Sequence, residues 1–189
     1  GKWHVGSFSG MWPLDRGFER YYGLIRGGSN HFKPHPDKLL MEGRRPVAPG
    51  EDFYTSDSFT DAAIAYVRES RQRSDDPFLL YLAFTAPHWP MHAPPEDIER
   101  YRGRYDTGWE PMRAGRFERM QELGVLHADS QLSPLDVKPW DETDPERREV
   151  LAHRMAIYAA MVDRLDQNVG RLVATLEELG VLDDTLILF

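Results

Sequence analysis

The fold of this chain is decided by the stretch Phe78-Leu79-Leu80-Tyr81-Leu82-Ala83-Phe84, followed by Thr85-Ala86-Pro87-His88-Trp89-Pro90. A short, continuous apolar run bounded by breaker residues is typical of a strand that is buried on both faces. Such strands lie in the middle of α/β sheets, where ligands bind beyond the carboxyl ends of the strands. His88 therefore lies where an α/β enzyme keeps a functional residue. A histidine in a proline-rich turn is an equally good interpretation of this stretch alone.

A helical pattern precedes this run, with Ser56 or Asp57 as the expected N-cap. Arginines crowd its last turns up to residue 73, where the helix dipole favours cations. A helix followed by a buried strand is half of a βαβ unit, which predicts an α/β fold with a central mixed, mostly parallel sheet. The apolar residues of this helix recur at spacings of three and four: Phe59, Ala62, Ala63, Tyr66 and Val67.

The strongest helical signal lies near the end of the chain. Thr143 or Asp144 is the expected cap, Pro145 suits the first turn, and Gly180 ends the helix. A strict heptad can indicate a coiled coil, but the apolar run 185–189 that follows favours packing on a sheet of the same domain. The apolar stripe of this helix recurs at alternating steps of four and three residues: Leu151, Met155, Tyr158, Val162, Leu165, Val169, Leu172, Leu176 and Leu179.

Three polar residues beside that stripe, Asp163, Arg164 and Asp166, are predicted to form its solvated flank. Between the two long helices, the pattern predicts shorter ones over 96–101 and 111–123. Residues 7–54 are rich in glycine and proline, and Met41–Arg45 has the character of a hairpin turn.

Composition excludes several classes of protein. Of the 189 residues, 41% are apolar and 29% are charged, which is ordinary for a globular domain. A net charge of −8 without a basic face argues against a nucleic-acid partner. The chain contains no cysteine, so it has neither disulfides nor thiolate metal ligands. No apolar stretch is long enough to predict a membrane span.

Both ends of the chain suggest an internal segment of a longer protein. It opens at Gly1 without a methionine and finishes on the apolar run 185–189 with no turn after it. A buried strand needs paired neighbours at its edges, and natural termini rarely fall halfway through one.

Two basic residues stand at the start of the chain, in Gly1-Lys2-Trp3-His4-Val5-Gly6. In an extended conformation, Lys2 and His4 project from the same face. One fixed charge beside one group that titrates near neutral pH suits an oxyanion, although a solvated strand end is favoured by the pattern alone.

Two histidine pairs have the i, i+4 spacing of helical zinc ligands, namely His31 with His35 and His88 with His92. Prolines interrupt both pairs and remove the helix that would give this spacing a meaning. No metal ligand is therefore expected within this chain.

Taken together, these motifs resemble the type I, formylglycine-dependent sulfatases of the bacterial arylsulfatase kind. Residues 1–6 look like the family's Gly-Lys-Trp-His-Leu-Gly signature, and residues 17–23 are similar to the Gly-Phe-Asp-x-Phe/Tyr-Tyr-Gly that follows it. Residues 86–90 resemble the family's Ala-Pro-His-x-Pro strand end, and 156–163 and 185–189 look like its long helix and the next strand. The resemblance covers essentially the whole chain, with its motifs in the right order.

The resemblance implies an alkaline-phosphatase-like α/β/α sandwich, of which residues 1–189 are the central portion of the N-terminal catalytic domain. It implies hydrolysis of sulfate monoesters by a formylglycine nucleophile beside a Ca2+ ion. Carried over by position, the resemblance implies that Lys2 bridges a sulfate oxygen and the formylglycine, and that His4 hydrogen-bonds the formylglycine hydroxyl. It also implies that His88 contacts the sulfate near the leaving oxygen, as a candidate proton donor. Fixed cations aimed at that oxygen lower the barrier as its charge develops.

The chain departs from the family pattern in what it lacks. It has no Cys/Ser-x-Pro-x-Arg motif, no N-terminal Asp pair and no Ser-Asp-Asn-Gly turn. We therefore expect the Ca2+ ligands and the formylglycine to lie outside this segment, and the segment alone to be inactive. Two alternatives stay open: a phosphodiesterase or phosphonate monoester hydrolase of the same superfamily, and a non-catalytic, degenerate relative.

The expected partner is a small-molecule or glycan sulfate ester. Loops 26–32, 89–92 and 105–109 are expected to set its specificity. The resemblance also implies a periplasmic or secreted protein, since bacterial members of the family are commonly exported.

Overall fold

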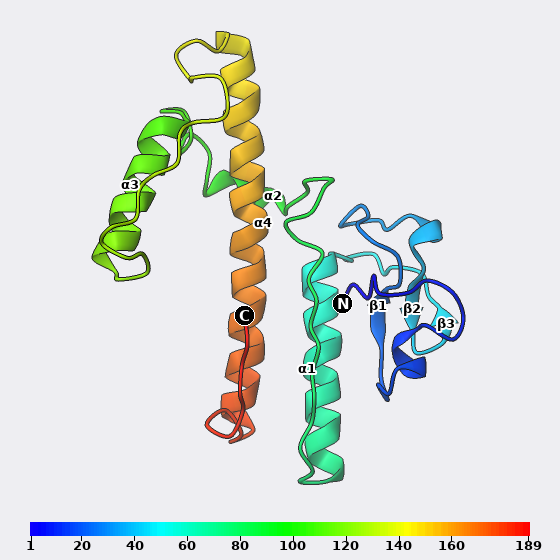
Figure 1. Ribbon diagram of the computed structural model, residues 1–189. Helices are drawn as coiled ribbons and strands as arrows, with labels where there is room; N and C mark the ends of the chain where they lie inside the picture. The colour runs from blue at the N-terminus through cyan, green and yellow to red at the C-terminus, as the bar shows by residue number, and fades with distance from the viewer. The chain divides into compact units, whose positions relative to one another are not determined.

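The computed structural model describes all residues, 1–189, with its helices and strands labelled in Figure 1. The chain divides into two compact units. The first unit comprises Gly1–Ala93 and Met161–Phe189, and the second comprises Pro94–Ala160. The long helix α4 contributes residues to both units. The first unit contains η1 (Pro13–Asp15), β1 (Tyr22–Leu24), η2 (Pro36–Lys38), β2 (Leu40–Glu42), β3 (Arg45–Pro46) and α1 (Thr55–Arg73). The second contains α2 (Pro95–Glu99) and α3 (Trp109–Glu122), and α4 spans Pro145–Glu178.

The only sheet has three short antiparallel strands in the order β1-β2-β3. Glu42 pairs with Arg45 across a two-residue turn, in which Gly43 has a φ of 57°. That left-handed conformation suits glycine, and the predicted hairpin turn is confirmed. On the other edge of β1, Lys2 forms an isolated parallel bridge with Leu24.

The strands predicted at 78–84 and 185–189 are not formed, and this part of the prediction is wrong for the chain as it stands. Leu79 is 82% exposed and Leu188 is 85% exposed. One contact of the expected kind exists, because the Lys2 N–H donates to the Ala83 carbonyl over 2.7 Å. A strand requires a ladder of such bonds to a neighbouring chain segment, and an apolar pattern records burial without supplying that neighbour.

Helix α1 begins at Thr55, two to three residues before the first helical positions that the predicted caps imply. Its N-cap, Tyr54, makes no side-chain capping bond. The Thr55 N–H instead donates to the His31 carbonyl over 2.9 Å, so a loop supplies the acceptor that a cap would provide. The predicted apolar face is confirmed, since Phe59, Ala63 and Val67 are buried.

The core of the first unit lies between α1 and the small sheet. One cluster joins Leu24, Leu40, Phe53 and Phe59, and Leu82 packs against it from the central apolar run. A second cluster contains Tyr21, Ile25 and Met41, with Trp3 packed against it. These contacts hold the first residues of the chain and the run 78–84 close to β1.

Helix α4 has the predicted limits, but its buried face differs from the predicted stripe. Tyr158 is 40% exposed and Val162 is 42% exposed. Of the predicted stripe, only Leu176 is fully buried. The buried positions are mostly smaller or polar residues: Ala152, Ala156, Ala160, Met161, Asn168, Thr175 and Leu176.

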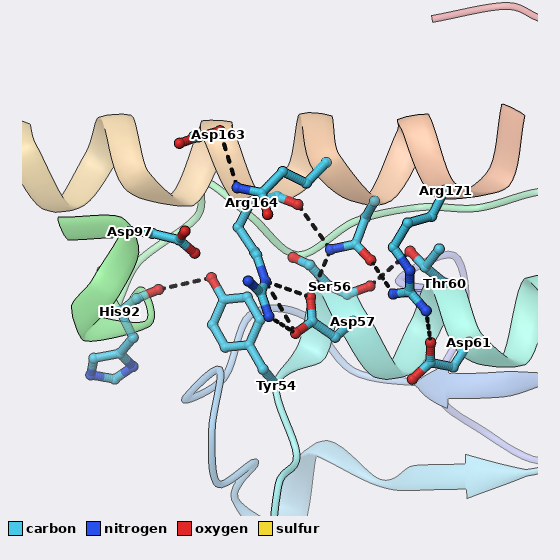
Figure 2. A network of polar contacts seen from close by, with 12 residues as sticks. Tyr54, Ser56, Asp57, Thr60, Asp61, His92, Asp97, Asp163, Arg164 and Arg171 are labelled. Carbon is cyan, nitrogen blue, oxygen red and sulfur yellow. Dashed lines mark hydrogen bonds and ion pairs between the residues drawn. The ribbon is translucent and has the colours of Figure 1, made fainter. Parts of the chain in front are cut away.

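Within the first unit, α1 and α4 are joined by a polar network (Figure 2). The Arg164 guanidinium donates to both carboxylate oxygens of Asp57, at 2.7 to 3.1 Å, and Asn168 Nδ2 donates to the same carboxylate at 2.7 Å. The prediction that Arg164 belongs to a solvated flank is therefore wrong, because a residue on α1 pairs with it. Arg171 and Asp61 form a further ion pair in the same row.

The second unit contains the two shorter predicted helices, α2 and α3, close to their predicted limits. The Trp109 and Trp140 rings meet edge to face at 4.6 Å, and Trp140 Nε1 donates to the Asp106 carbonyl over 3.2 Å.

None of the helices in the structure is both long and apolar enough to cross a membrane.

Candidate active site

His88 lies in a turn directly after the central apolar run. Its N–H donates to the Thr85 carbonyl over 3.0 Å, and the flanking Ala86–Pro87 and Trp89–Pro90 peptide bonds are cis. Its ring Nδ1 lies 2.5 Å from the Trp89 carbonyl oxygen. A carbonyl only accepts, so this contact assigns the ring proton to Nδ1. Nε2 is then the nitrogen that can exchange a proton with a ligand.

His4 approaches the same place from the start of the chain. Its N–H donates to the Ile25 carbonyl over 3.1 Å, and its φ is 53°. This left-handed conformation breaks the extended pattern that placed Lys2 and His4 on one face, so that expectation is wrong. The strand geometry ends at Trp3, and the His4 side chain takes its direction from the turn.

Two consecutive glycines make room for the two imidazoles. A Cβ on Gly27 would lie 3.3 Å from His4 Nε2, and a Cβ on Gly28 would lie 2.4 Å from His88 Nδ1. The second distance is too short for any side chain to be accommodated without displacing the ring. His4 and His88, 84 residues apart in the chain, therefore lie beside consecutive residues of this glycine pair.

Lys2 is tied to this region through its backbone. It lies between Leu24 and Ala83 and lines a groove of about 500 Å³, formed with α1 and residues 78–83. That groove is lined by neither His4 nor His88. The glycine pair, where the titratable groups gather, is therefore the better candidate for chemistry than the larger hollow.

His31 is a residue of this region whose position sequence reasoning missed. Its side chain is fully buried, with Nδ1 2.8 Å from Thr55 Oγ1 and Nε2 3.1 Å from the His88 carbonyl oxygen. Burial lowers the pKa of His31, the bond to the His88 carbonyl partly offsets this effect, and the nearby His92 and His88 rings add to the lowering. The sequence offered only its spacing to His35, which the prolines between them make irrelevant.

Two of the three loops expected to set specificity meet beside His88. The Phe32 and His92 ring centroids are 6.2 Å apart, and the Tyr54 hydroxyl donates to the His92 carbonyl over 3.0 Å (Figure 2). Trp89 extends into solvent here, 61% exposed. The third loop, 105–109, belongs to the other unit.

The described residues contain no group of three or more His, Asp or Glu side chains that could hold a metal ion. The chain also has no cysteine and no serine in a Ser-x-Pro-x-Arg motif. The Ca2+ ion and the formylglycine that the resemblance implies therefore do not fit residues of this chain, and we assign neither to it.

Known proteins resemble this chain over its whole length. The whole chain, residues 1–189, matches the family described as Sulfatase. The chain belongs to the sulfatase family. It is 37% identical to an uncharacterised sulfatase of Schizosaccharomyces pombe, over all of this chain and 37% of that protein. It is 33% identical to an arylsulfatase of Klebsiella aerogenes, over all of this chain and 42% of that one. This sulfatase chain thus spans about two-fifths of the length of these relatives.

The fold of this chain is similar to that of a solved crystal structure. The crystal structure of Ps i-CgsB in complex with k-i-k-neocarrahexaose matches 95% of this chain and 33% of that one, with a TM-score of 0.60 at 24% identity. This likeness confirms the predicted alkaline-phosphatase-like α/β fold class. Within residues 1–189, that class is represented by its helices and a small antiparallel sheet.

Proposed function

We propose that residues 1–189 are the central portion of the N-terminal catalytic domain of a sulfuric ester hydrolase that cleaves sulfate monoesters. Family membership supports the reaction class. The observation that carries the proposal is the placement of His4 beside Gly27 and of His88 beside Gly28. Two imidazoles held beside consecutive backbone positions suit a site where an anion is bound and a proton is transferred.

In this proposal, His88 donates a proton to the leaving oxygen. Its Nδ1–H is already engaged by the Trp89 carbonyl, so a protonated ring presents its second N–H from Nε2.

Lys2 supplies positive charge to the sulfate, and His4 is the residue that we propose to hydrogen-bond the hydroxyl of the family's formylglycine. The His4 backbone is held by a bond to Ile25, and the Lys2 backbone is held two residues earlier between two partners. Charges held in place before the reaction stabilise a developing oxyanion without reorganisation in the transition state. In this proposal, the Ca2+ ion and the formylglycine that are general to the family belong to residues outside 1–189.

The substrate we propose is a small-molecule or glycan sulfate ester, bound beside the loops that carry Phe32 and Trp89. Exposed aromatic side chains suit either an aryl group or a sugar ring. We also propose a periplasmic or secreted location, which family resemblance alone supports.

Parallel assays on the full-length protein test this function. An aryl sulfate, a phosphodiester and a phosphonate monoester are offered under the same conditions, and we expect the sulfate ester to be hydrolysed fastest. Faster turnover of either phosphorus ester would instead assign the chain to a phosphohydrolase. No turnover of any of the three would indicate a non-catalytic relative.

A further inference from the structure

His31 is the most connected buried polar side chain near the candidate site. Its Nε2 faces the His88 carbonyl at 3.1 Å, and that oxygen only accepts. The proton therefore resides on Nε2, and Nδ1 accepts from the Thr55 hydroxyl at 2.8 Å. Both ring nitrogens are satisfied in this neutral tautomer.

Thr55 holds His31 through two contacts. Besides the hydroxyl bond, the Thr55 N–H donates to the His31 carbonyl over 2.9 Å. Thr55 is the first residue of α1, a helix of 19 residues whose buried face packs against the small sheet. The polar chain from Thr55 through His31 therefore anchors the His88 turn to a long helix.

We propose that His31 is a positioning residue for His88, held by Thr55 and acting through the His88 carbonyl. The inference rests on the proposed function, since it assigns a role relative to the His88 ring. A bond to the carbonyl fixes the peptide plane after His88, and the Trp89 carbonyl that orients the ring lies in the next residue. A small rotation of this turn would displace Nε2 from the leaving oxygen.

The charge state of His31 also matters to His88. The titratable side chains that face His31 are His88, His92 and the ring of Tyr54. Burial lowers the pKa of His31, so its ring stays neutral and Nδ1 remains free to accept from the Thr55 hydroxyl. A protonated ring would lose that acceptor and with it the anchor of the His88 turn.

The test uses four variants of the full-length enzyme with an aryl sulfate. His31→Leu removes both side-chain bonds, whereas the His31→Gln amide retains a donor for the His88 carbonyl. Thr55→Val removes the hydroxyl that holds His31. Thr60→Val is the matched control: Thr60 is equally buried on α1, and its hydroxyl donates to the Ser56 carbonyl over 2.8 Å without contacting the turn.

We expect His31→Leu to lower kcat by about 10- to 100-fold with KM changed by less than about twofold, since misplacing a catalytic group by 1 Å has effects of that order. His31→Gln is expected to recover most of this loss. Thr55→Val is expected to lower kcat by roughly 3- to 10-fold and to shift the His88 limb of the pH profile. Thr60→Val is expected to change neither.

The proposal is overturned if His31→Leu keeps the wild-type kcat and pH profile, or if Thr60→Val loses as much activity as Thr55→Val. If His31→Leu fails to fold, the comparison of kcat between Thr55→Val and Thr60→Val decides. A wild-type protein without sulfatase activity refutes the proposed function separately. The titration of the His88 ring by NMR then decides: a shift in Thr55→Val but not in Thr60→Val supports positioning, and equal behaviour refutes it.

Discussion

The turn around His88 and the apolar run that leads into it are neighbours in sequence and opposites in structure. The turn is held by bonds from Thr85, His31 and the Trp89 carbonyl, all within the chain. The run contributes Leu82 to the core and leaves Leu79 in solvent. A turn can be fixed by a few directed contacts, whereas a strand depends on a continuous neighbouring ladder. Order at the candidate site therefore does not require a completed sheet.

The sharpest test of this comparison is whether the ordered turn carries the chemistry. In the full-length protein, His88→Ala is expected to lower aryl sulfate turnover by about 10²- to 10³-fold, the usual effect of removing a positioned acid or charge stabiliser. The control is His127→Ala, a histidine whose side chain is 80% exposed and pairs with Asp129. Equal rates for the two variants would make His88 an ordinary turn residue.

The His88 turn can also be disturbed through Gly28, the residue that faces the His88 ring. In Gly28→Ala, the new Cβ would lie 2.4 Å from His88 Nδ1, so the ring must move. We expect kcat for the aryl sulfate to fall by roughly 10- to 100-fold, with the unfolding midpoint nearly unchanged. Gly50→Ala is the matched control, because a Cβ there meets nothing within 4 Å. Wild-type kcat in Gly28→Ala would contradict the position assigned to the ring.

Removal of Asp57 tests what holds α1, the helix behind the turn. Asp57→Ala leaves Arg164 and Asn168 without their shared acceptor. The Arg164 side chain is 26% exposed and that of Asp57 is 21% exposed. We expect unfolding in urea to show a loss of about 1–3 kcal/mol. Asp61→Ala, which breaks the more exposed pair with Arg171, is expected to lose less than about 1 kcal/mol. The opposite order would show that the partly buried network around Asp57 does not stabilise the helix pair.

The smallest expected effect is a pH dependence of stability that originates at His31. Burial lowers its folded-state pKa below the ordinary value of 6.5, so below pH 6.5 the unfolded chain binds more protons than the folded one. Stability from this group is present above pH 6.5 and is lost as the pH falls toward the folded-state pKa. His31→Gln should flatten the urea-unfolding free energy between pH 5 and 7 relative to wild type. An unchanged slope in that variant would assign the pH dependence to other groups.

Local patterns predicted the elements whose ends are set by nearby residues. Helix α4 starts at Pro145, and Gly180 follows it with a φ of 68°. The hairpin between Glu42 and Arg45 is equally well predicted by its local sequence. The start of α1 is not predicted by its local sequence, because the first N–H of the helix is satisfied by His31, 24 residues earlier. The buried face of α4 was misjudged for a similar reason, since the partner of Arg164 is 107 residues away.

Local sequence patterns are enough to predict the helices, the hairpin, the position of His88 after an apolar run and the order of motifs that indicates a sulfatase. These features depend on periodicity and on residue types that lie close together in the chain. Folding, in contrast, places His4 beside Gly27 and His88 beside Gly28, and links the His88 turn to Thr55 through His31. Those contacts join four separate segments, and they arise from the path of the folded chain, which no local pattern records.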